Sequence, residues 1–297
     1  MSVLGELSAV VLPVLLIAGI GFLWSKTGRR FDSAFLTDVV TNVGTPCLVA
    51  HSLTSLQIEP TALGEMGAAV LIAIAGFLIL GVIVLKVMKL SLNSYLPALM
   101  FPNTGNMGLP LSLFAFGQEG LGLAVVYFAC TVSLQFTLGI SISAGNLSLS
   151  RLVRTPAIYA VAISVFLLVF KIPVPAWIDN TIGVLGGLTI PLMLLTLGVS
   201  LAQMKVNALG RNLLLACVRL LGGFLIAFAV TSFFDLSPIA RGALIIQSSM
   251  PVAVFNFLFA QHYGRAHGDV AAMVVLSTIL SFLTLPLLAY YVLQQVP

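Results

Sequence analysis

The sequence predicts an all-α polytopic membrane protein whose ten transmembrane helices form two inverted repeats of five helices each. The chain of 297 residues is 60% hydrophobic and only 7% charged, whereas soluble domains carry roughly 25% charged residues. The apolar residues gather into ten segments long enough to span a bilayer. Two of these segments are interrupted in mid-span by proline and polar residues, and the two interruptions lie about half the chain length apart.

Each predicted span is a mostly apolar segment of about 20 residues, the length that a helix needs to cross the hydrocarbon core. No soluble domain is expected between the spans because the loops are short. Residues 1–12 contain no Lys or Arg, so the first segment is predicted to be a retained span rather than a cleaved signal peptide. The ten predicted spans are 6–25, 34–56, 62–86, 93–116, 121–145, 153–171, 178–202, 210–234, 238–261 and 268–293.

Basic residues are distributed unequally between the two sets of loops. The loops after the odd-numbered spans carry ten Lys and Arg residues, and the loops on the other side carry only Lys171 and Arg241. Lys and Arg in short loops favour the cytoplasmic side, so both termini are predicted to lie outside. The net charge of +4 is spread over these loops and forms no stripe, so no nucleic-acid partner is expected.

A shift of 145 residues aligns features of the two halves. Pro46 aligns with Pro191, and the interruption that begins at Asn103 aligns with the one that begins at Ser248. Five spans per half give the halves opposite orientations in the membrane, an architecture found in many transporters. The two predicted repeats are residues 1–148 and 149–297.

The fourth and ninth spans are predicted to be broken helices. The segment Pro102–Pro110 holds two prolines, two glycines and two asparagines, and Pro251 has Ser248, Ser249 and Asn256 around it. Proline and glycine interrupt helices, and unwound backbone at membrane depth occurs where it is buried in protein or lines a wet cavity. Helix N-termini at such breaks carry partial positive charge and bind anions. The alternative for each span is a simple proline kink. Two breaks at matched positions favour crossing helices that form one transport site.

Three motifs carry a family resemblance. The segment Asn103–Pro110, NTGNMGLP, resembles the signature of the auxin efflux carrier family in its bacterial branch. Pro191–Gly198 and Met250–Ala253 are similar to later motifs of that family. The resemblance implies membership of a wider superfamily that includes the sodium–bile-acid symporters. It also implies that spans four and nine cross at prolines, with the substrate beside the crossing.

The resemblance further implies a substrate site and a substrate class. Plant members have a long loop between the halves, whereas this chain has about seven residues there (146–152), as in compact microbial members. Those members are associated with malonate, malate and lactate rather than auxin. The implied substrate-binding residues are Asn103, Thr104, Gly105, Asn106, Met107 and Pro110 at the first break, and Ser249, Met250, Pro251 and Asn256 at the second.

Polar residues elsewhere in the spans are candidates for ion coupling or support. Asp38 and Asn42 share a helix face, and Asp38 is predicted either to carry a proton or bind a cation, or to lie in water at the cytoplasmic edge. Arg219 is predicted to pair with a carboxylate such as Asp38, to attract the substrate, or to reach the interface.

Oxygen-bearing residues on the fifth and ninth spans suggest a sodium site. The resemblance to the symporters implies oxygen ligands from Thr131, Ser133, Gln135 and Gln247. The alternative is that the hydroxyls bond to carbonyls of their own helix.

These features predict a secondary transporter of small organic anions that works by alternating access around the crossing. The alternatives are a sodium-coupled symporter of bile-acid-like anions, an auxin-like carboxylate efflux carrier, and a channel or sensor. No enzyme is predicted, because the sequence has no HExxH motif and no nucleophile with a base. No cofactor is expected, and Na+ and H+ are the candidate coupling ions. The expected location is the bacterial inner (plasma) membrane, the lipid bilayer and the anion are the expected partners, and a homodimer is left open.

Overall fold

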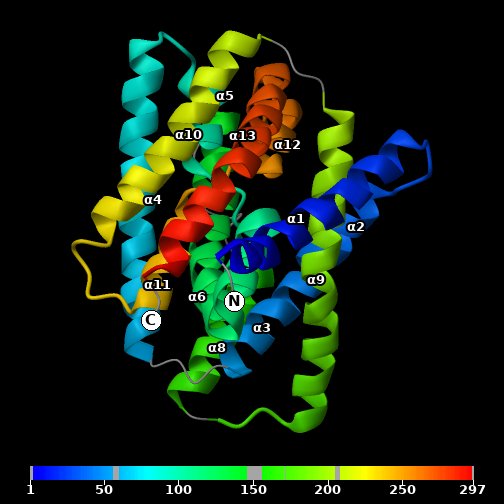
Figure 1. Ribbon diagram of the computed structural model, residues 1–297, viewed down its shortest axis with the longest axis vertical. Coiled ribbons are helices and arrows are strands. Elements are labelled where there is room, and N and C mark those ends of the chain that lie inside the picture. The colour runs from blue at the N-terminus through cyan, green and yellow to red at the C-terminus, as the bar shows by residue number, and fades with distance from the viewer. Residues whose placement is uncertain (1–2, 56–59, 146–155, 171, 205–207, 296–297) are drawn as a thin grey trace.

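The described part of the chain is helical. The computed structural model describes all residues except 1–2, 56–59, 146–155, 171, 205–207 and 296–297 (Figure 1). The predicted boundary between the repeats, at residues 148 and 149, lies outside the described residues. In chain order the elements are α1 (Val3–Lys26), α2 (Ser33–Val39), η1 (Val40–Gly44), α3 (Thr45–Ser55), α4 (Pro60–Val87), α5 (Leu92–Met100), η2 (Thr104–Gly108), α6 (Leu109–Leu134), η3 (Gln135–Gly139), α7 (Ile140–Ala144), α8 (Pro156–Val169), α9 (Ala176–Gln203), α10 (Leu209–Val230), α11 (Pro238–Ser248), α12 (Val254–His262) and α13 (His267–Leu293).

Six helical segments in the described part are long and apolar enough to cross a membrane, which confirms the all-α polytopic class. The predicted count of ten is not decided by length alone, because breaks divide other spans into shorter helices. Gly117 has φ 64°, which turns the chain within α6 between the predicted fourth and fifth spans. The six segments are Ser8–Lys26, Thr61–Val87, Thr104–Ala144, Ala176–Gln203, Leu209–Val230 and His267–Leu293.

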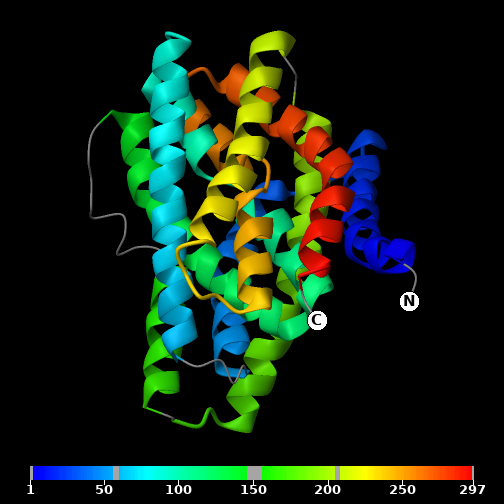
Figure 2. The same ribbon diagram turned by 60° about the vertical axis from the view of Figure 1, so that its left-hand side comes forward.

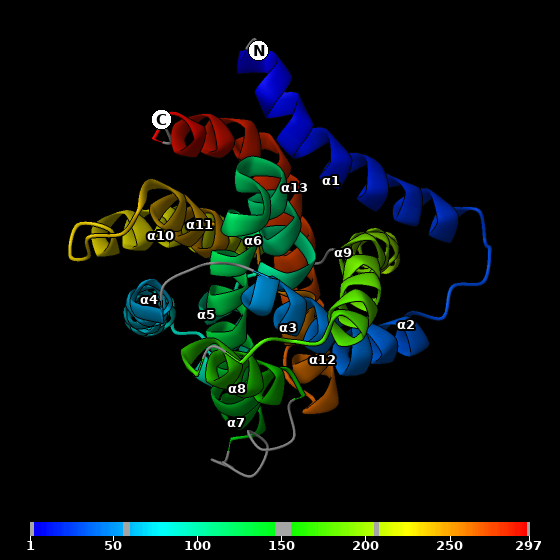
Figure 3. The ribbon, with the colours of Figure 1, turned by 90° about the horizontal axis from the view of Figure 1, so that it is seen from below.

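The helices gather into two bundles. In the first bundle α1 packs along α9, α9 also contacts α3 and η1, and α3 packs on α8. In the second bundle α4 packs on α5, α6 and α10, while α13 packs on α10 and α12. From below, α1, α2 and α9 lie on one side of the molecule and α4 and α10 on the other (Figure 3). α6 contacts α1 and α3 of the first bundle, so it joins the two groups.

The outer surface of the long helices is apolar. Ile79 on α4, Leu221 on α10 and Leu287 on α13 are each more than half exposed. Exposed side chains of this kind along helices of spanning length face lipid rather than water. In the turned view (Figure 2), α1 stands at one edge of the molecule, apart from α4 and α10.

The two interrupted spans meet inside the second bundle. Pro102 and Val252 form an isolated antiparallel bridge. The Asn103 amide donates to the Pro251 carbonyl at 2.7 Å, and the Ala253 amide donates to the Phe101 carbonyl at 3.2 Å. We call residues 101–103 and 251–253 the crossing. Its bridge pairs residues 150 positions apart, so the sequence offset of 145 is five residues too short here.

The closest helix contact in the first bundle depends on glycine. A Cβ atom on Gly198 of α9 would overlap the carbonyl oxygen of Ala18 on α1, and one on Gly21 of α1 would overlap the backbone of Leu195. Gly187, on the same helix α9, has no heavy atom within 4 Å of the position of a Cβ. The helices α1 and α9 therefore approach to backbone contact at Gly21 and Gly198.

We expect Gly198→Ala to lower the melting temperature of the purified protein in detergent, because overpacking a tight contact costs about 1–3 kcal/mol. Gly187→Ala is the matched control. Its melting temperature should stay the same or rise slightly, because alanine favours a helix over glycine by up to about 1 kcal/mol. Equal melting temperatures for the two variants would contradict the close α1–α9 contact.

Candidate functional site

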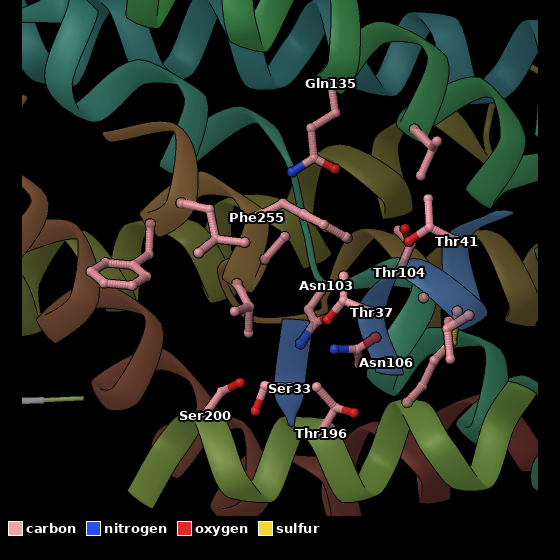
Figure 4. Close-up of a pocket in the computed structure, with 18 of the residues that line it drawn as sticks. Ser33, Thr37, Thr41, Asn103, Thr104, Asn106, Gln135, Thr196, Ser200 and Phe255 are labelled. Atoms are coloured by element: carbon pink, nitrogen blue, oxygen red, sulfur yellow. The ribbon is translucent and has the colours of Figure 1, made fainter. Parts of the chain in front are cut away.

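A cavity of about 1000 Å³ lies beside the crossing. It is bounded by α2, η1 and α9 of the first bundle and by η2, η3 and α12 of the second bundle (Figure 4). All three π-helical turns of the described chain therefore contribute to its wall. Such turns often mark functional sites, because the extra residue per turn leaves side chains and carbonyls out of the regular ladder.

The first break supplies the polar centre of the cavity. Pro102, which lacks an amide hydrogen, ends α5, and the Asn103 carbonyl then accepts from the Gly108 amide at 3.1 Å to start η2. Asn103, Thr104, Gly105 and Asn106 all line the cavity. The Asn103 side chain is 4% exposed, and its Nδ2 has no hydrogen-bond partner among the described residues. This buried donor is available to a ligand (Figure 4).

The second break supplies backbone and apolar side chains instead. Ala253, Val254 and Phe255 line the cavity where α12 begins. Asn256 does not line it. The Asn256 Nδ2 donates to the Phe101 carbonyl at 3.0 Å, and its Oδ1 accepts from Gln135 Nε2 at 3.1 Å. Asn256 thus links the crossing to Gln135, and Gln135 is the residue that lines the cavity.

The first bundle provides a hydroxyl-rich wall. Ser33, Thr37 and Thr41 come from α2 and η1, and Thr196 and Ser200 come from α9. Sequence reasoning missed Thr196 and Ser200 as site residues. The available signal was their spacing of four, which places two hydroxyls on one face of an otherwise apolar helix.

Charge is scarce in the cavity wall. Asp38 is the carboxylate among the described lining residues, which include no Lys or Arg. Asp38 is exposed to the cavity, and the Asn42 Nδ2 donates to its backbone carbonyl at 3.0 Å. Both residues line the cavity, as does His267 at the start of α13.

An apolar patch completes the wall. Phe128, Phe136, Met193 and Phe255 line the cavity from α6, η3, α9 and α12. Phe136 packs edge-on against Phe255, with ring centroids 5.3 Å apart. The cavity can therefore hold a polar head near Asn103 and an apolar body against these rings.

Several residues that the resemblance placed at the substrate lie outside the cavity lining. Met107 is fully buried, and Pro110 is buried within α6. Met250 and Pro251 form the second break itself and are buried outside the lining, and the buried hydroxyl of Ser249 has no partner among the described residues. Their place is in the packing that supports the crossing.

The four candidate sodium ligands do not share one role. The Ser133 hydroxyl donates to the Ala129 carbonyl of its own helix at 2.6 Å, and Gln135 donates to Asn256. The hydroxyl of Thr131 and both polar atoms of the Gln247 amide are buried without a partner among the described residues. Sodium binding at this set stays a prediction.

Arg219 contacts backbone carbonyls rather than a carboxylate. Its Nη1 donates to the Leu99 carbonyl at 2.8 Å, its Nε to the Met250 carbonyl at 3.4 Å, and its Nη2 to the Ser248 carbonyl. The expected pairing with Asp38 is wrong, and so is the expectation that the side chain reaches the interface, because Arg219 is 2% exposed. Carbonyls at the ends of α5 and α11 accept from the guanidinium instead.

Comparison with known proteins identifies the family. The family described as membrane transport protein matches residues 140–289, about half of the chain. The chain belongs to this family of membrane transport proteins. The resemblance is thereby confirmed at the family level, and the protein is a transporter rather than an enzyme. The bacterial branch and the wider superfamily stay predictions.

Two relatives share nearly the full length of this transporter. An uncharacterized transporter of Methanothermobacter thermautotrophicus is 26% identical over 291 residues, which cover 93% of this chain and 95% of the relative. An uncharacterized transporter of Methanocaldococcus jannaschii is 23% identical over 304 residues, which cover 96% of this chain and 98% of the relative. Both similarities extend across the two breaks.

The wall of the cavity can be mapped by cysteine labelling. In a background with Cys47, Cys130 and Cys217 replaced by serine, we expect Asn106→Cys to react with a small water-soluble methanethiosulfonate, because Asn106 lines the cavity. Met107→Cys, one residue further along η2, should react at least about tenfold more slowly, because Met107 is fully buried. Equal rates would contradict this orientation of η2.

Proposed function

We propose that the protein is a secondary carrier that moves small organic anions across the membrane by alternating access around the crossing. The observation that carries this proposal is the cavity beside the two paired breaks. Into it faces a buried Asn103 amide without a partner among the described residues. Malonate, malate and lactate represent the substrate class.

The cavity offers an anion partial charges in place of a fixed cation. Two helical segments begin at its wall, at Thr104 and Val254. The first amides of a helix lack intrahelical partners, and each helix N-terminus carries about half a positive charge. A carboxylate held by such groups and by the Asn103 amide is bound without a salt bridge. Moderate binding of this kind favours release on the other side, which a carrier requires.

The proposed fold is ten spans in two inverted repeats, with spans four and nine crossing. The reciprocal hydrogen bonds Asn103–Pro251 and Ala253–Phe101 support it, because a two-fold axis through the bridge exchanges them. The first bundle, α1, α2, η1, α3, α8 and α9, would be the scaffold. The second bundle would rock against it and carry the crossing.

The cavity in this structure would face the cytoplasm. Its wall includes Ser33, Gln203 and His267, which lie beside the loops that follow the predicted first, seventh and ninth spans. The Lys and Arg distribution assigns those loops to the cytoplasm. We therefore propose an inward-open state in the plasma membrane. The same hypothesis leaves open whether the protein forms a homodimer and whether Na+ or H+ is the coupling ion.

A second candidate substrate is an amphipathic monocarboxylate, such as an auxin-like or bile-acid-like anion. The apolar patch of Phe128, Phe136, Met193 and Phe255 favours it. The cavity volume of about 1000 Å³ also lies at the upper end of pockets for drug-sized ligands. A dicarboxylate would leave this patch uncovered.

The function is tested by uptake into proteoliposomes across a panel of mono- and dicarboxylates, with Na+ and H+ gradients imposed separately. We expect saturable uptake that Asn103→Ala and Asn106→Ala reduce at least about tenfold, because each removes a polar group from the cavity wall. Thr181→Ala is the control, because the Thr181 hydroxyl bonds to its own helix far from the cavity wall. Normal uptake by both asparagine variants would refute the site.

Asp38 is the residue for a test of proton coupling. If Asp38 carries the coupled proton, Asp38→Asn should keep substrate exchange but lose accumulation driven by a proton gradient, because the amide does not titrate. The measurement is counterflow against net uptake in the same proteoliposomes. Unchanged proton-driven accumulation would exclude Asp38 as the coupling group.

A further inference from the structure

Arg219 is a buried cation at the crossing and does not line the cavity. It comes from α10 and donates to carbonyls of both breaks, at Leu99, Ser248 and Met250. None of these four residues lines the cavity. Among the described residues the two ion pairs are His51–Asp179 and Arg211–Asp269, so no carboxylate there neutralises Arg219.

Helix dipoles balance this charge. Helix α5 ends at Met100 and α11 ends at Ser248, so both helices direct their C-terminal carbonyls to the guanidinium. A helix C-terminus carries about half a negative charge. The two ends together offset about one positive charge, which is the charge of the guanidinium. Arg219 is thus neutralised by backbone alone.

The surrounding packing is shaped for this side chain. Gly223 lies one turn after Arg219, and a Cβ there would overlap the Ser248 carbonyl, so only glycine lets α10 approach the end of α11. The Phe77 ring of α4 lies 4.3 Å from the guanidinium carbon, a cation–π distance. The Tyr127 hydroxyl fixes the Ser248 side chain at 2.9 Å. Phe77 therefore contacts the guanidinium directly, while Gly223 and Tyr127 position the end of α11 beside it.

In other transporters with broken helices, unwound carbonyls and half-helix C-termini are the groups that coordinate a coupling Na+. Na+ in such a site takes oxygen ligands, as hard cations do. Here three of these oxygens already bind a guanidinium. A second cation nearby would meet the repulsion of Arg219 without a carboxylate to offset it, because Gln247, the residue before Ser248, is an amide.

We propose that Arg219 is a built-in cation that takes the place of a coupled Na+ at the crossing, so that the carrier binds and moves its anion without Na+. Arg219 is a positioning residue, because it acts on the substrate through the two breaks that it holds together. With the C-termini neutralised, the N-termini at Thr104 and Val254 are left to attract the anion. This inference rests on the proposed function.

The first test needs no substrate. We expect Arg219→Ala to lower the melting temperature of the purified protein by about 10 °C or more, because three carbonyls lose a charged donor. Guanidinium chloride at low millimolar concentration should restore at least half of that loss and leave the wild type unchanged. Arg211→Met on the same helix is the control, with a smaller loss, because Arg211 pairs with a carboxylate in a more exposed place. No rescue by guanidinium, or equal losses for both variants, would overturn the proposal.

The second test concerns Na+ directly. Replacing Na+ by K+ or choline should leave wild-type uptake, and the substrate-induced rise in melting temperature, unchanged. Arg219→Lys, which keeps the charge but cannot reach three carbonyls at once, should weaken substrate binding at least about tenfold. A tenfold loss of wild-type uptake without Na+ would overturn the proposal. If no anion on the panel is moved by the wild type, the proposed function fails, while guanidinium rescue of Arg219→Ala still decides the role of Arg219.

Discussion

The structure depends on how two stretches of unwound backbone are satisfied within the membrane-spanning part of the protein. Each broken span leaves carbonyls at the end of one half-helix and amides at the start of the next. The crossing pairs some of these groups with each other, through Asn103 with Pro251 and Ala253 with Phe101. Arg219 binds carbonyls that remain, at Leu99, Ser248 and Met250. Without both arrangements, each unpaired group would cost free energy comparable to a lost hydrogen bond.

This division gives the crossing two chemically different sides. The C-terminal carbonyls of α5 and α11 bind a guanidinium within the second bundle. The N-termini of the helical segments that follow the two breaks lie at the cavity. An anion in the cavity is then attracted by helix N-termini whose opposing C-termini are already neutralised. In the proposed function, the same separation explains how the cavity attracts an anion although its described wall has no Lys or Arg.

The sequence predicted the breaks well and their surroundings poorly. Prolines and glycines in Pro102–Pro110 mark an interruption wherever they occur, because they remove a donor or relax the backbone. The partner of Arg219 could not be predicted, because backbone carbonyls leave no signature in the sequence. Asn256 was predicted to be a ligand from its position shortly after Pro251, yet its side chain bonds to Gln135 and to the Phe101 carbonyl. Thr196 and Ser200 were not predicted as site residues, because single hydroxyls in apolar helices usually bond to the backbone of their own helix.

The sequence by itself determined the membrane class and the positions of the two breaks, because composition and proline are local properties. It also contained the motif that resembles the family to which the chain belongs. Only the tertiary structure decided that Pro102 pairs with Val252, that η1, η2 and η3 share one cavity, and that Arg219 lies at the crossing but does not line the cavity. These facts join residues that lie far apart in the chain, and such contacts are set by helix packing rather than by any local pattern.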